Sequence, residues 1–375
     1  MRKILFLVTE DWYFWSHRLP LARAAQAAGH EVLVATRVQD HGDRIRTQGF
    51  RLIPIGLRRS SRNPLCEIKA IYELYQIYST EKPDLVHQVA IKPILYGSLA
   101  ARFAGIKAIV NALTGLGYVF IAKGKKAFFL RSLITPFFWF AFSCRNCRGI
   151  FQNPEDRQTF IDRKIIIPEK AVLIRGSGVN TDLFSPVPEA EGEPKAILAS
   201  RMLWDKGVGD LVEASKLLKN RGMPGRVILA GRPDPDNPAS IPEEILTGWH
   251  EKGEIIWLGH RENIPRLLQQ CHVAVLPSSY REGIPKCLLE AASAGLPLVA
   301  TDVRGCREIV RNGVNGFIVP PKDPERLAQA LATLLQNREL RQRMGKASRE
   351  IAVNEFSEEL VVRATLALYE ELLGN

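Results

Sequence analysis

Short aliphatic segments alternate with helical patterns along almost the whole chain. Strands separated by helices of about 10–15 residues indicate βαβ units and parallel sheets. These segments form two consecutive series, so we predict two doubly wound, Rossmann-like α/β domains. The predicted strands are 4–8, 32–36, 52–55, 85–88, 108–112 and 150–152, then 196–200, 227–230, 255–258, 273–276, 298–301 and 317–319. The helical patterns include 19–28, 68–78, 208–219, 264–270, 327–346 and 358–373.

A Pro-rich, acidic segment at 185–194 separates the two series and shows no apolar periodicity, which is typical of a linker. The length of 375 residues suits two domains better than one core. We expect an N-terminal domain over 1–180 and a C-terminal domain over 195–355, with a last helix at about 356–375 returning to the first. Ligands of such sheets bind beyond the carboxyl ends of the strands, so we expect the site in a cleft between the two sheets.

The charge of the chain is unevenly distributed. Residues 1–180 contain 27 Lys and Arg against 13 Asp and Glu, whereas the remainder contains 24 against 27. Residues 85–154 contain nine basic residues and no acidic one. This asymmetry predicts that the first domain faces an anionic partner: a membrane, a nucleic acid or a polyphosphate.

The segment after the strand 273–276 has the pattern of an anion-binding turn. Pro285 stands where a helix begins, and Gly283 permits close approach of the backbone, so the nearby amides can receive a phosphate. Glu290 is placed to hold a ribose diol, and Glu282 to hold sugar hydroxyls. An ordinary strand–loop–helix turn with solvated glutamates is the alternative. The candidate residues of this phosphate- and diol-binding turn are Gly283, Ile284, Pro285, Lys286 and Glu290.

Two cations follow the first strand of the second series. Arg201 ends this strand, and Lys206 with Gly207 opens the next helix. The planar guanidinium of Arg and the compact ammonium of Lys suit a diphosphate leaving group. Taken alone, this pattern is equally compatible with an exposed pair of loop charges.

Together these segments resemble the retaining glycosyltransferases of family 4, which have the GT-B fold. The Arg-x4-Lys-Gly element (201–207) and the Glu-x7-Glu element (282–290) match in order, and 178–184, 305–310 and 312–317 match further family patterns. The resemblance is closest to enzymes that extend polyprenyl-diphosphate-linked sugars, such as the N-acetylgalactosaminyltransferases acting on undecaprenyl-diphosphate-bacillosamine in bacterial N-glycan assembly. This likeness is carried by 16–20, 115–118, 203–207 and 231–232.

The resemblance implies a retaining transfer of a hexose or N-acetylhexosamine from a UDP-sugar to a polyprenyl-diphosphate-linked saccharide. Arg201, Lys206 and Glu282 would be catalytic, with no cofactor and no divalent metal. Asp234-Pro235-Asp236 formally matches a metal signature, but we interpret it as a turn. Further implied positions are Gly259 and His260 near the base, and His17, Gly115 and Gly117 on the acceptor side.

The chain also departs from the family pattern. Residues 10–15 are bulky and aromatic where many members have a Gly-Gly loop, and His87 is not part of a His-x-His motif. A histidine contact with the transferred sugar is therefore in doubt. His17 is the better acceptor-side candidate, because we expect it at a helix start.

The segment 123–143 is basic and aromatic. It is too short to span a bilayer and is interrupted by Pro136. This basic and aromatic composition favours a segment that lies in the interface of an anionic membrane, and a buried aromatic helix is the alternative. The scattered cysteines favour a reducing cytosol, so we expect peripheral association with the inner face of the cell membrane. The proposed contacts are Lys123, Lys125, Lys126, Phe128, Phe129, Arg131, Phe137, Phe138 and Trp139.

Other functions remain open at this point. A UDP-sugar 2-epimerase shares the fold but needs no acceptor, and a glycosyltransferase acting on a soluble acceptor shares the donor motifs. A basic non-enzymatic protein that binds membranes or nucleic acids is a third reading. No recognised nucleic-acid module occurs in the sequence, so we expect no nucleic-acid partner.

Overall fold

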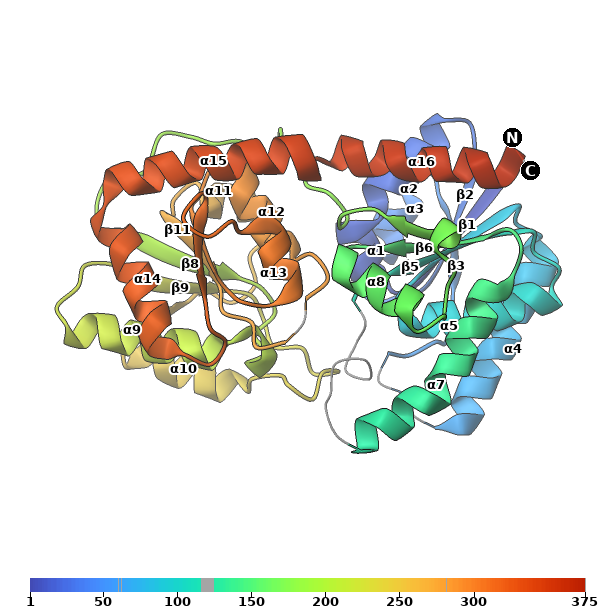
Figure 1. Ribbon diagram of the computed structural model, residues 1–375, viewed down its shortest axis with the longest axis horizontal. Helices are drawn as coiled ribbons and strands as arrows, with labels where there is room; N and C mark the ends of the chain where they lie inside the picture. The colour runs from blue at the N-terminus through green and yellow to red at the C-terminus, as the bar shows by residue number, and fades with distance from the viewer. Residues whose placement is uncertain (60, 62, 116–124, 281, 375) are drawn as a thin grey trace. The chain divides into compact units, whose positions relative to one another are not determined.

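The computed structural model describes residues 1–59, 61, 63–115, 125–280 and 282–374 (Figure 1). The chain divides into two compact units. The first comprises Met1–Ser177 with Glu359–Asn375, and the second comprises Gly178–Glu358. The segment 185–194, expected as a linker, therefore belongs to the second unit.

The first unit contains a seven-stranded parallel sheet in the order β3-β2-β1-β4-β5-β6-β7. The order reverses beside β1, which makes the sheet doubly wound. Its strands are nearly continuous apolar runs because helices cover both faces. The strands are β1 Lys3–Glu10, β2 Glu31–Arg37, β3 Arg51–Pro54, β4 Leu85–Val89, β5 Ala108–Leu113, β6 Cys147–Phe151 and β7 Ala171–Leu173.

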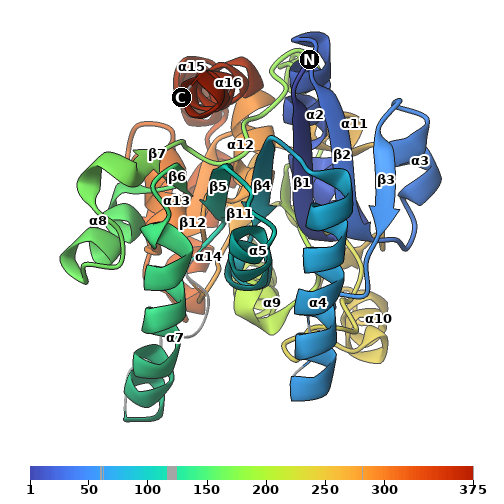
Figure 2. The same cartoon turned by 90° about the vertical axis from the view of Figure 1, so that its right-hand side faces the viewer.

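Alternate residues of these strands face two separate cores. One core lies under α4, α5, α7 and α8, and the other under α1, α2, α3 and α16; Figure 2 shows α4, α5 and α7 along one side. The helices are α1 Asp11–His17, α2 Leu19–Ala27, α3 Gly42–Arg46, α4 Pro64–Glu81, α5 Ile91–Phe103, α7 Lys125–Ser143, α8 Pro154–Asp162 and α16 Glu358–Gly374, with a 3-10 turn η1 at Pro168–Lys170.

Helix α16 packs on the first sheet through Tyr369, which is fully buried. The Tyr369 hydroxyl and His87 Nδ1 on β4 lie 2.6 Å apart, and His87 also stacks on Phe6 of β1. Burial, aided by the nearby Arg18 cation, holds the pKa of His87 well below its usual value. His87 is thus a neutral core residue, whose polar contact fixes α16 to the sheet.

The second unit contains a six-stranded parallel sheet in the order β10-β9-β8-β11-β12-β13, with the same reversal beside β8. Its strands are β8 Lys195–Ala199, β9 Arg226–Ala230, β10 Ile256–Trp257, β11 Val273–Leu276, β12 Leu298–Thr301 and β13 Gly316–Val319. Its helices are η2 Trp204–Lys206, α9 Val208–Asn220, α10 Glu243–Glu251, α11 Ile264–Leu268, α12 Lys286–Ser293, α13 Arg304–Ile309, α14 Pro324–Gln336 and α15 Arg338–Phe356.

Three local features differ from the sequence prediction. Residues 11–17 form helix α1, because Phe14 is buried against Phe6 and Phe50 and fixes the turn. Strand β7 was not predicted, since it is only three residues long. The helical pattern 327–346 is split at Asn337, whose side chain accepts a hydrogen bond from Leu340 N and caps α15.

Candidate functional site

The carboxyl ends of β8, β11 and β12 form one edge of the second sheet, because these three strands are neighbours. The turn η2 follows β8 and packs directly on the end of β11. Gly207 has a φ of +73°, and a Cβ there would lie 1.9 Å from Pro277 O. Only glycine therefore allows this approach, which brings Lys206 to the loop after β11.

Lys206 and Glu282 form an ion pair at this edge. Lys206 Nζ lies 2.7 Å from Glu282 Oε1, and the Ser278 hydroxyl donates to the same oxygen at 2.9 Å. Burial opposes the charge of Lys206, but the facing Glu282 carboxylate outweighs it and raises the pKa of Lys206. Two predicted catalytic residues, 76 positions apart in the chain, are thus in direct contact.

Arg201 is held by Asp234, a partner that the sequence did not reveal. Arg201 Nη1 lies 2.5 Å from Asp234 Oδ2. The segment 234–236 does turn, since Asn237 N donates to Asp234 O and Ser240 Oγ accepts from Asp234 N. Because this turn is hydrogen-bonded internally, Asp234 is a fixed counter-charge for Arg201.

Glu290 lies on α12 with its side chain partly buried. Burial raises the pKa of Glu290 to about 7, against the opposing effect of the Lys286 cation. Within the described residues its carboxylate has no hydrogen-bond partner. The Cys287 thiol lies near both Glu290 and the Lys206–Glu282 pair, since the charges of all three residues act on its pKa. Glu290 is therefore a carboxylate beside the ion pair with its acceptor oxygens available.

The loop that carries Glu282 is positioned by α13. A Cβ on Gly305 would lie 1.9 Å from Gly283 O, so the first turn of α13 touches this loop. Helix α12 begins at Lys286, with Pro285 as its N-cap and no side-chain cap. Pro285 was predicted as the first helical position, and the helix instead begins one residue later, with Pro285 as its N-cap. The N-terminus of α12, with its partial positive charge, lies at the same edge of the sheet.

Gly259 and His260 follow β10, at the far end of the same edge. Gly259 O accepts from Gly231 N at 2.8 Å, which ties this turn to the end of β9. His260 is exposed. The two residues therefore share an edge with Arg201 but are separated from it by β9.

The acceptor-side candidates lie in the first unit, which we describe by itself. His17 is the last residue of α1 rather than at the predicted helix start; its ring stacks on Tyr13 at 4.1 Å, and its Nδ1 lies 2.6 Å from Ser16 Oγ. Gly115 follows β5 at the carboxyl edge of that sheet. Gly117 lies outside the described residues.

The aromatic segment forms helix α7, and its side chains divide between two environments. Phe129, Phe137 and Trp139 are exposed by 66%, 61% and 58%. Phe138 is fully buried against Phe160, so its prediction as a membrane contact was wrong: it lies on the core face of the helix. Arg131 is partly buried.

Several predicted membrane contacts are not covered by the structure. Lys123 lies outside the described residues. Lys125, Lys126 and Phe128 belong to α7, but their side chains are not described. No helix in the described part of the chain is long and apolar enough to cross a membrane.

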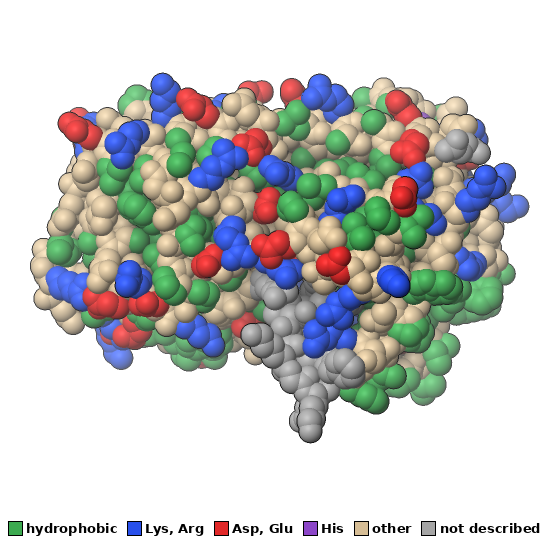
Figure 3. Space-filling model, in the orientation of Figure 1, with side chains coloured by type: hydrophobic (Ala, Val, Ile, Leu, Met, Phe, Trp, Pro, Cys, Tyr) green, Lys and Arg blue, Asp and Glu red, His purple; other side chains and the backbone are tan. Residues whose placement is uncertain are grey.

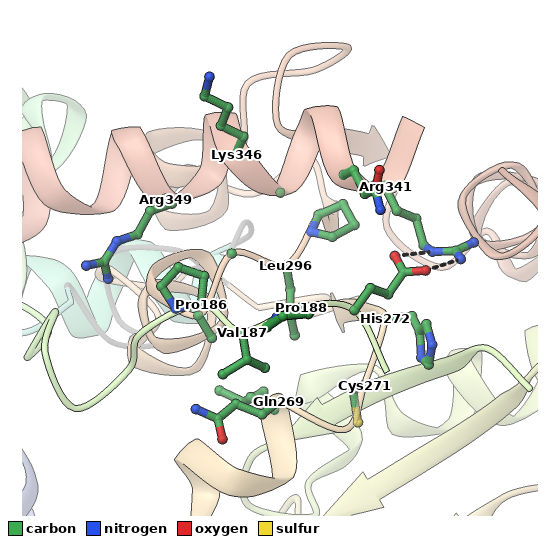
Figure 4. Close-up of a pocket in the computed structure, with 17 residues that line it drawn as sticks. Pro186, Val187, Pro188, Gln269, Cys271, His272, Leu296, Arg341, Lys346 and Arg349 are labelled. Carbon is green, nitrogen blue, oxygen red and sulfur yellow. Dashed lines mark hydrogen bonds and ion pairs between the residues drawn. The ribbon is translucent and has the colours of Figure 1, made fainter. Parts of the chain in front are cut away.

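A cavity of about 350 Å³ lies at the opposite edge of the second sheet, where β11 and β12 begin (Figure 4). Several of its polar side chains make structural contacts. Arg341 pairs with Glu189 at 2.7 Å, and His272 bridges Lys195 N and Ala190 O. These contacts fasten the segment 185–194 to the second unit, so the cavity is a packing feature away from the charged edge.

The charged edge combines the cations Arg201 and Lys206, the carboxylates Asp234, Glu282 and Glu290, and a helix N-terminus. Each of Arg201 and Lys206 is already neutralised by a carboxylate at hydrogen-bonding distance. A bound diphosphate matches both cations by charge, and a diol matches the acceptor oxygens of the Glu290 carboxylate. Among the described residues, no group of three His, Cys, Asp or Glu side chains is placed to hold a metal ion.

Comparisons with known proteins identify the family of the chain. The family model for group 1 glycosyl transferases matches residues 179–351, and the model for glycosyl transferase 4-like proteins matches residues 3–152. The fold and these two matches thus define a glycosyltransferase of the GT-B class, which confirms the predicted fold class. The chain belongs to the group 1 and 4-like glycosyltransferases.

Similar proteins cover the whole chain. The N,N'-diacetylbacillosaminyl-diphospho-undecaprenol alpha-1,3-N-acetylgalactosaminyltransferase of Campylobacter jejuni is 28% identical, over 100% of both chains. The UDP-Gal:alpha-D-GlcNAc-diphosphoundecaprenol alpha-1,3-galactosyltransferase of Escherichia coli is 27% identical over 82% of this chain and 81% of its own. The structure of HepE from Anabaena with UDP and glucose superposes with a TM-score of 0.79 at 18% identity, over 99% of this chain and 100% of HepE.

Proposed function

We propose that the chain is a retaining glycosyltransferase that moves a hexose or N-acetylhexosamine from a UDP-sugar to a polyprenyl-diphosphate-linked saccharide. The process it serves is the assembly of bacterial surface glycans or N-glycans. The observation that carries the proposal is the convergence of Arg201, Lys206, Glu282 and Glu290 on one sheet edge. The names of the similar C. jejuni and E. coli enzymes, both of which include a diphosphate-linked undecaprenol, support the acceptor class.

In the proposed complex the diphosphate exchanges with the carboxylates that hold Arg201 and Lys206. Because both cations are pre-positioned by these carboxylates, their reorganisation on binding is small. Glu290 accepts hydrogen bonds from the ribose hydroxyls, and Glu282, released from Lys206, binds hydroxyls of the transferred sugar. The backbone of 283–286 contacts phosphate oxygens, and Gly259 and His260 lie beside the base.

The proposed chemistry breaks the bond between the anomeric carbon and the diphosphate oxygen. The acceptor hydroxyl forms the new glycosidic bond on the same face, and its proton passes to the departing phosphate. Arg201 and Lys206 stabilise the negative charge that develops on the diphosphate, which is the role a divalent cation plays in other enzymes. We therefore propose that transfer needs no divalent metal and no cofactor.

The first unit supplies the acceptor side in this proposal, through His17, Gly115 and Gly117. The exposed rings of α7 support contact with an anionic membrane surface, where a polyprenyl carrier resides. We propose peripheral association with the inner face of the cell membrane, and no nucleic-acid partner.

A donor panel followed by a transfer assay tests this function. UDP-, GDP- and dTDP-sugars are screened by thermal shift, and the stabilising donor is then incubated with a short polyprenyl-diphosphate sugar. We expect stabilisation by a UDP-sugar and a product with the anomeric configuration of the donor. Stabilisation by GDP- or dTDP-sugars alone contradicts the donor, an inverted product contradicts retention, and conversion of a UDP-sugar without acceptor indicates an epimerase instead.

A further inference from the structure

Helix α4 exposes an apolar stripe that the sequence analysis did not single out. Leu65, Ile68, Tyr72 and Tyr75 are exposed by 76%, 63%, 58% and 37%. Their spacing of three, four and three residues places them on one face of the helix. The opposite face is apolar as well and is buried in the core of the first unit. A helix of a soluble protein normally presents a polar face to water, so this second apolar face indicates a partner.

The acidic side chains near this stripe are engaged elsewhere. Glu67 accepts from Lys92 Nζ at 2.9 Å, and Glu73 accepts from Gly56 N at 2.9 Å. Lys69 on the helix and Arg58 before it are exposed. The exposed face of α4 is therefore apolar and cationic, which complements an apolar phase with an anionic surface.

Helix α7 presents a matching stripe. Phe129, Leu133 and Phe137 are exposed by 66%, 51% and 61% and follow each other at intervals of four residues. The helix contains no acidic residue. In Figure 2, α4 and α7 lie on either side of α5 and both extend beyond it in the same direction, with their N-terminal turns at the far end. Figure 3 shows hydrophobic side chains gathered over this end of the first unit.

We propose that α4 and α7 form one two-helix surface that docks the first unit on an anionic lipid bilayer. The surface consists of the exposed apolar stripes of two separate helices, and apolar stripes flanked by cations suit insertion among lipid headgroups. Tyr72 and Tyr75 add rings with a polar tip, the chemistry of the membrane interface. This inference rests on the proposed function, which gives the protein a reason to approach a membrane. It adds α4 as a second membrane contact, independent of α7.

Cosedimentation with vesicles tests the surface in the full chain. The probes are vesicles of phosphatidylcholine alone and of phosphatidylcholine with phosphatidylglycerol. The α4 variant is Leu65→Ser/Ile68→Ser/Tyr72→Ser, and the α7 variant is Phe129→Ser/Leu133→Ser/Phe137→Ser. A matched control removes three exposed apolar side chains from the second unit: Leu183→Ser/Ile245→Ser/Val314→Ser.

We expect wild type and the control to bind anionic vesicles equally and neutral vesicles weakly. Each helix variant should lose at least about tenfold in partitioning, because three exposed apolar side chains no longer enter the interface. All variants should keep the far-UV circular dichroism spectrum and the melting temperature of wild type, which shows that both units are folded. An α4 variant that binds anionic vesicles like wild type overturns the proposal.

Two further outcomes separate this inference from the proposed function. If the α4 variant loses dimers seen for wild type by light scattering while keeping vesicle binding, the stripe belongs to an interface between copies and the proposal is overturned. If vesicle binding depends on α4 but no UDP-sugar is transferred to any lipid-linked acceptor, the surface stands and the proposed function fails.

Discussion

Lys206 and Glu282 meet across 2.7 Å with side chains that are only 17% and 13% exposed. Removal of one partner of such a buried pair strongly destabilises the folded protein, because the remaining charge is left uncompensated. A diphosphate that binds Lys206 would have to break this ion pair. Glu282 therefore has two states in the proposed account: counter-ion of Lys206 in the free protein and ligand of the sugar in the complex.

Replacing Lys206 by Ala should lower kcat/KM about a hundredfold, a loss on the order of 3 kcal/mol of transition-state stabilisation. The reason is that the diphosphate loses a cation at the moment its charge develops. Initial rates of transfer measured against UDP-sugar concentration check this value. The control is Lys216→Ala, which removes an equally charged lysine from α9 that is paired with Glu213 at the surface. A Lys206→Ala enzyme within threefold of wild type contradicts the assignment.

Replacing Asp234 by Asn should tighten the binding of UDP about threefold to tenfold, since Asp234 competes with the diphosphate for Arg201 across 2.5 Å. Isothermal titration calorimetry with UDP measures this change. In an Arg201→Ala background the same replacement should have no effect, because the contested cation is gone. Unchanged or weaker UDP binding by the Asp234→Asn variant shows that the pair only positions Arg201.

The binding of a UDP-sugar should strengthen as the pH rises through 7. The pKa of Glu290 is about 7, and only the ionised carboxylate accepts both ribose hydroxyls. Between pH 6 and pH 8 the ionised fraction rises from about a tenth to about nine-tenths, so Kd should fall about tenfold. The Glu290→Gln variant should bind weakly and without this slope. A flat profile for wild type contradicts the ribose role of Glu290.

The raised pKa of Glu290 also predicts that the folded protein becomes less stable as the pH rises, whereas the binding of a UDP-sugar becomes stronger. Its folded pKa lies above the ordinary 4.5, so the folded state holds the proton more tightly than the unfolded state. This contribution to stability is present below about pH 4.5 and is lost as the pH rises to about 7. Urea denaturation of wild type and Glu290→Gln over this range should show the difference between them growing with pH.

Transfer should be insensitive to chelation, because Arg201 and Lys206 supply the positive charge at the diphosphate. Rates in excess EDTA should stay within about twofold of those in Mg²⁺. Restoration of a lost rate by Mg²⁺ or Mn²⁺ would show that a metal takes part. A metal-dependent glycosyltransferase assayed in parallel shows that the chelator is effective.

Replacing Tyr369 by Phe should destabilise the first unit by about 1–3 kcal/mol. The change removes the hydroxyl that meets His87 Nδ1 at 2.6 Å, and His87 Nε2 already has no partner among the described residues. Urea denaturation followed by circular dichroism measures the loss. Tyr75→Phe, on an exposed ring of α4, is the matched control and should leave the midpoint unchanged.

The fold was predictable because its determinants are local. Segments such as 4–8 and 273–276 are continuous apolar runs. Such runs are typical of strands that are covered by helices on both faces of a sheet. The motifs of the site were predictable for a related reason. Arg201, Lys206 and Glu282 each follow a strand, and the carboxyl ends of parallel strands meet at one edge.

Other features depend on contacts that no local pattern encodes. Asp234 belongs to a turn by its sequence, and only the folded chain places it beside Arg201. Phe137 and Phe138 are identical in type and adjacent, yet the rotation of α7 exposes one and buries the other. The apolar stripe of α4 resembles a buried face in the sequence, and its exposure is a property of the packing alone.

The central claim is that this chain transfers a sugar from a UDP-sugar to a lipid-linked saccharide. The most direct measurement is the release of UDP from the UDP-sugar with and without a short polyprenyl-diphosphate sugar. We predict release that requires the acceptor and matches, mole for mole, the glycosylated lipid formed. Release that is independent of the acceptor, or conversion of the UDP-sugar without any UDP, would contradict the account.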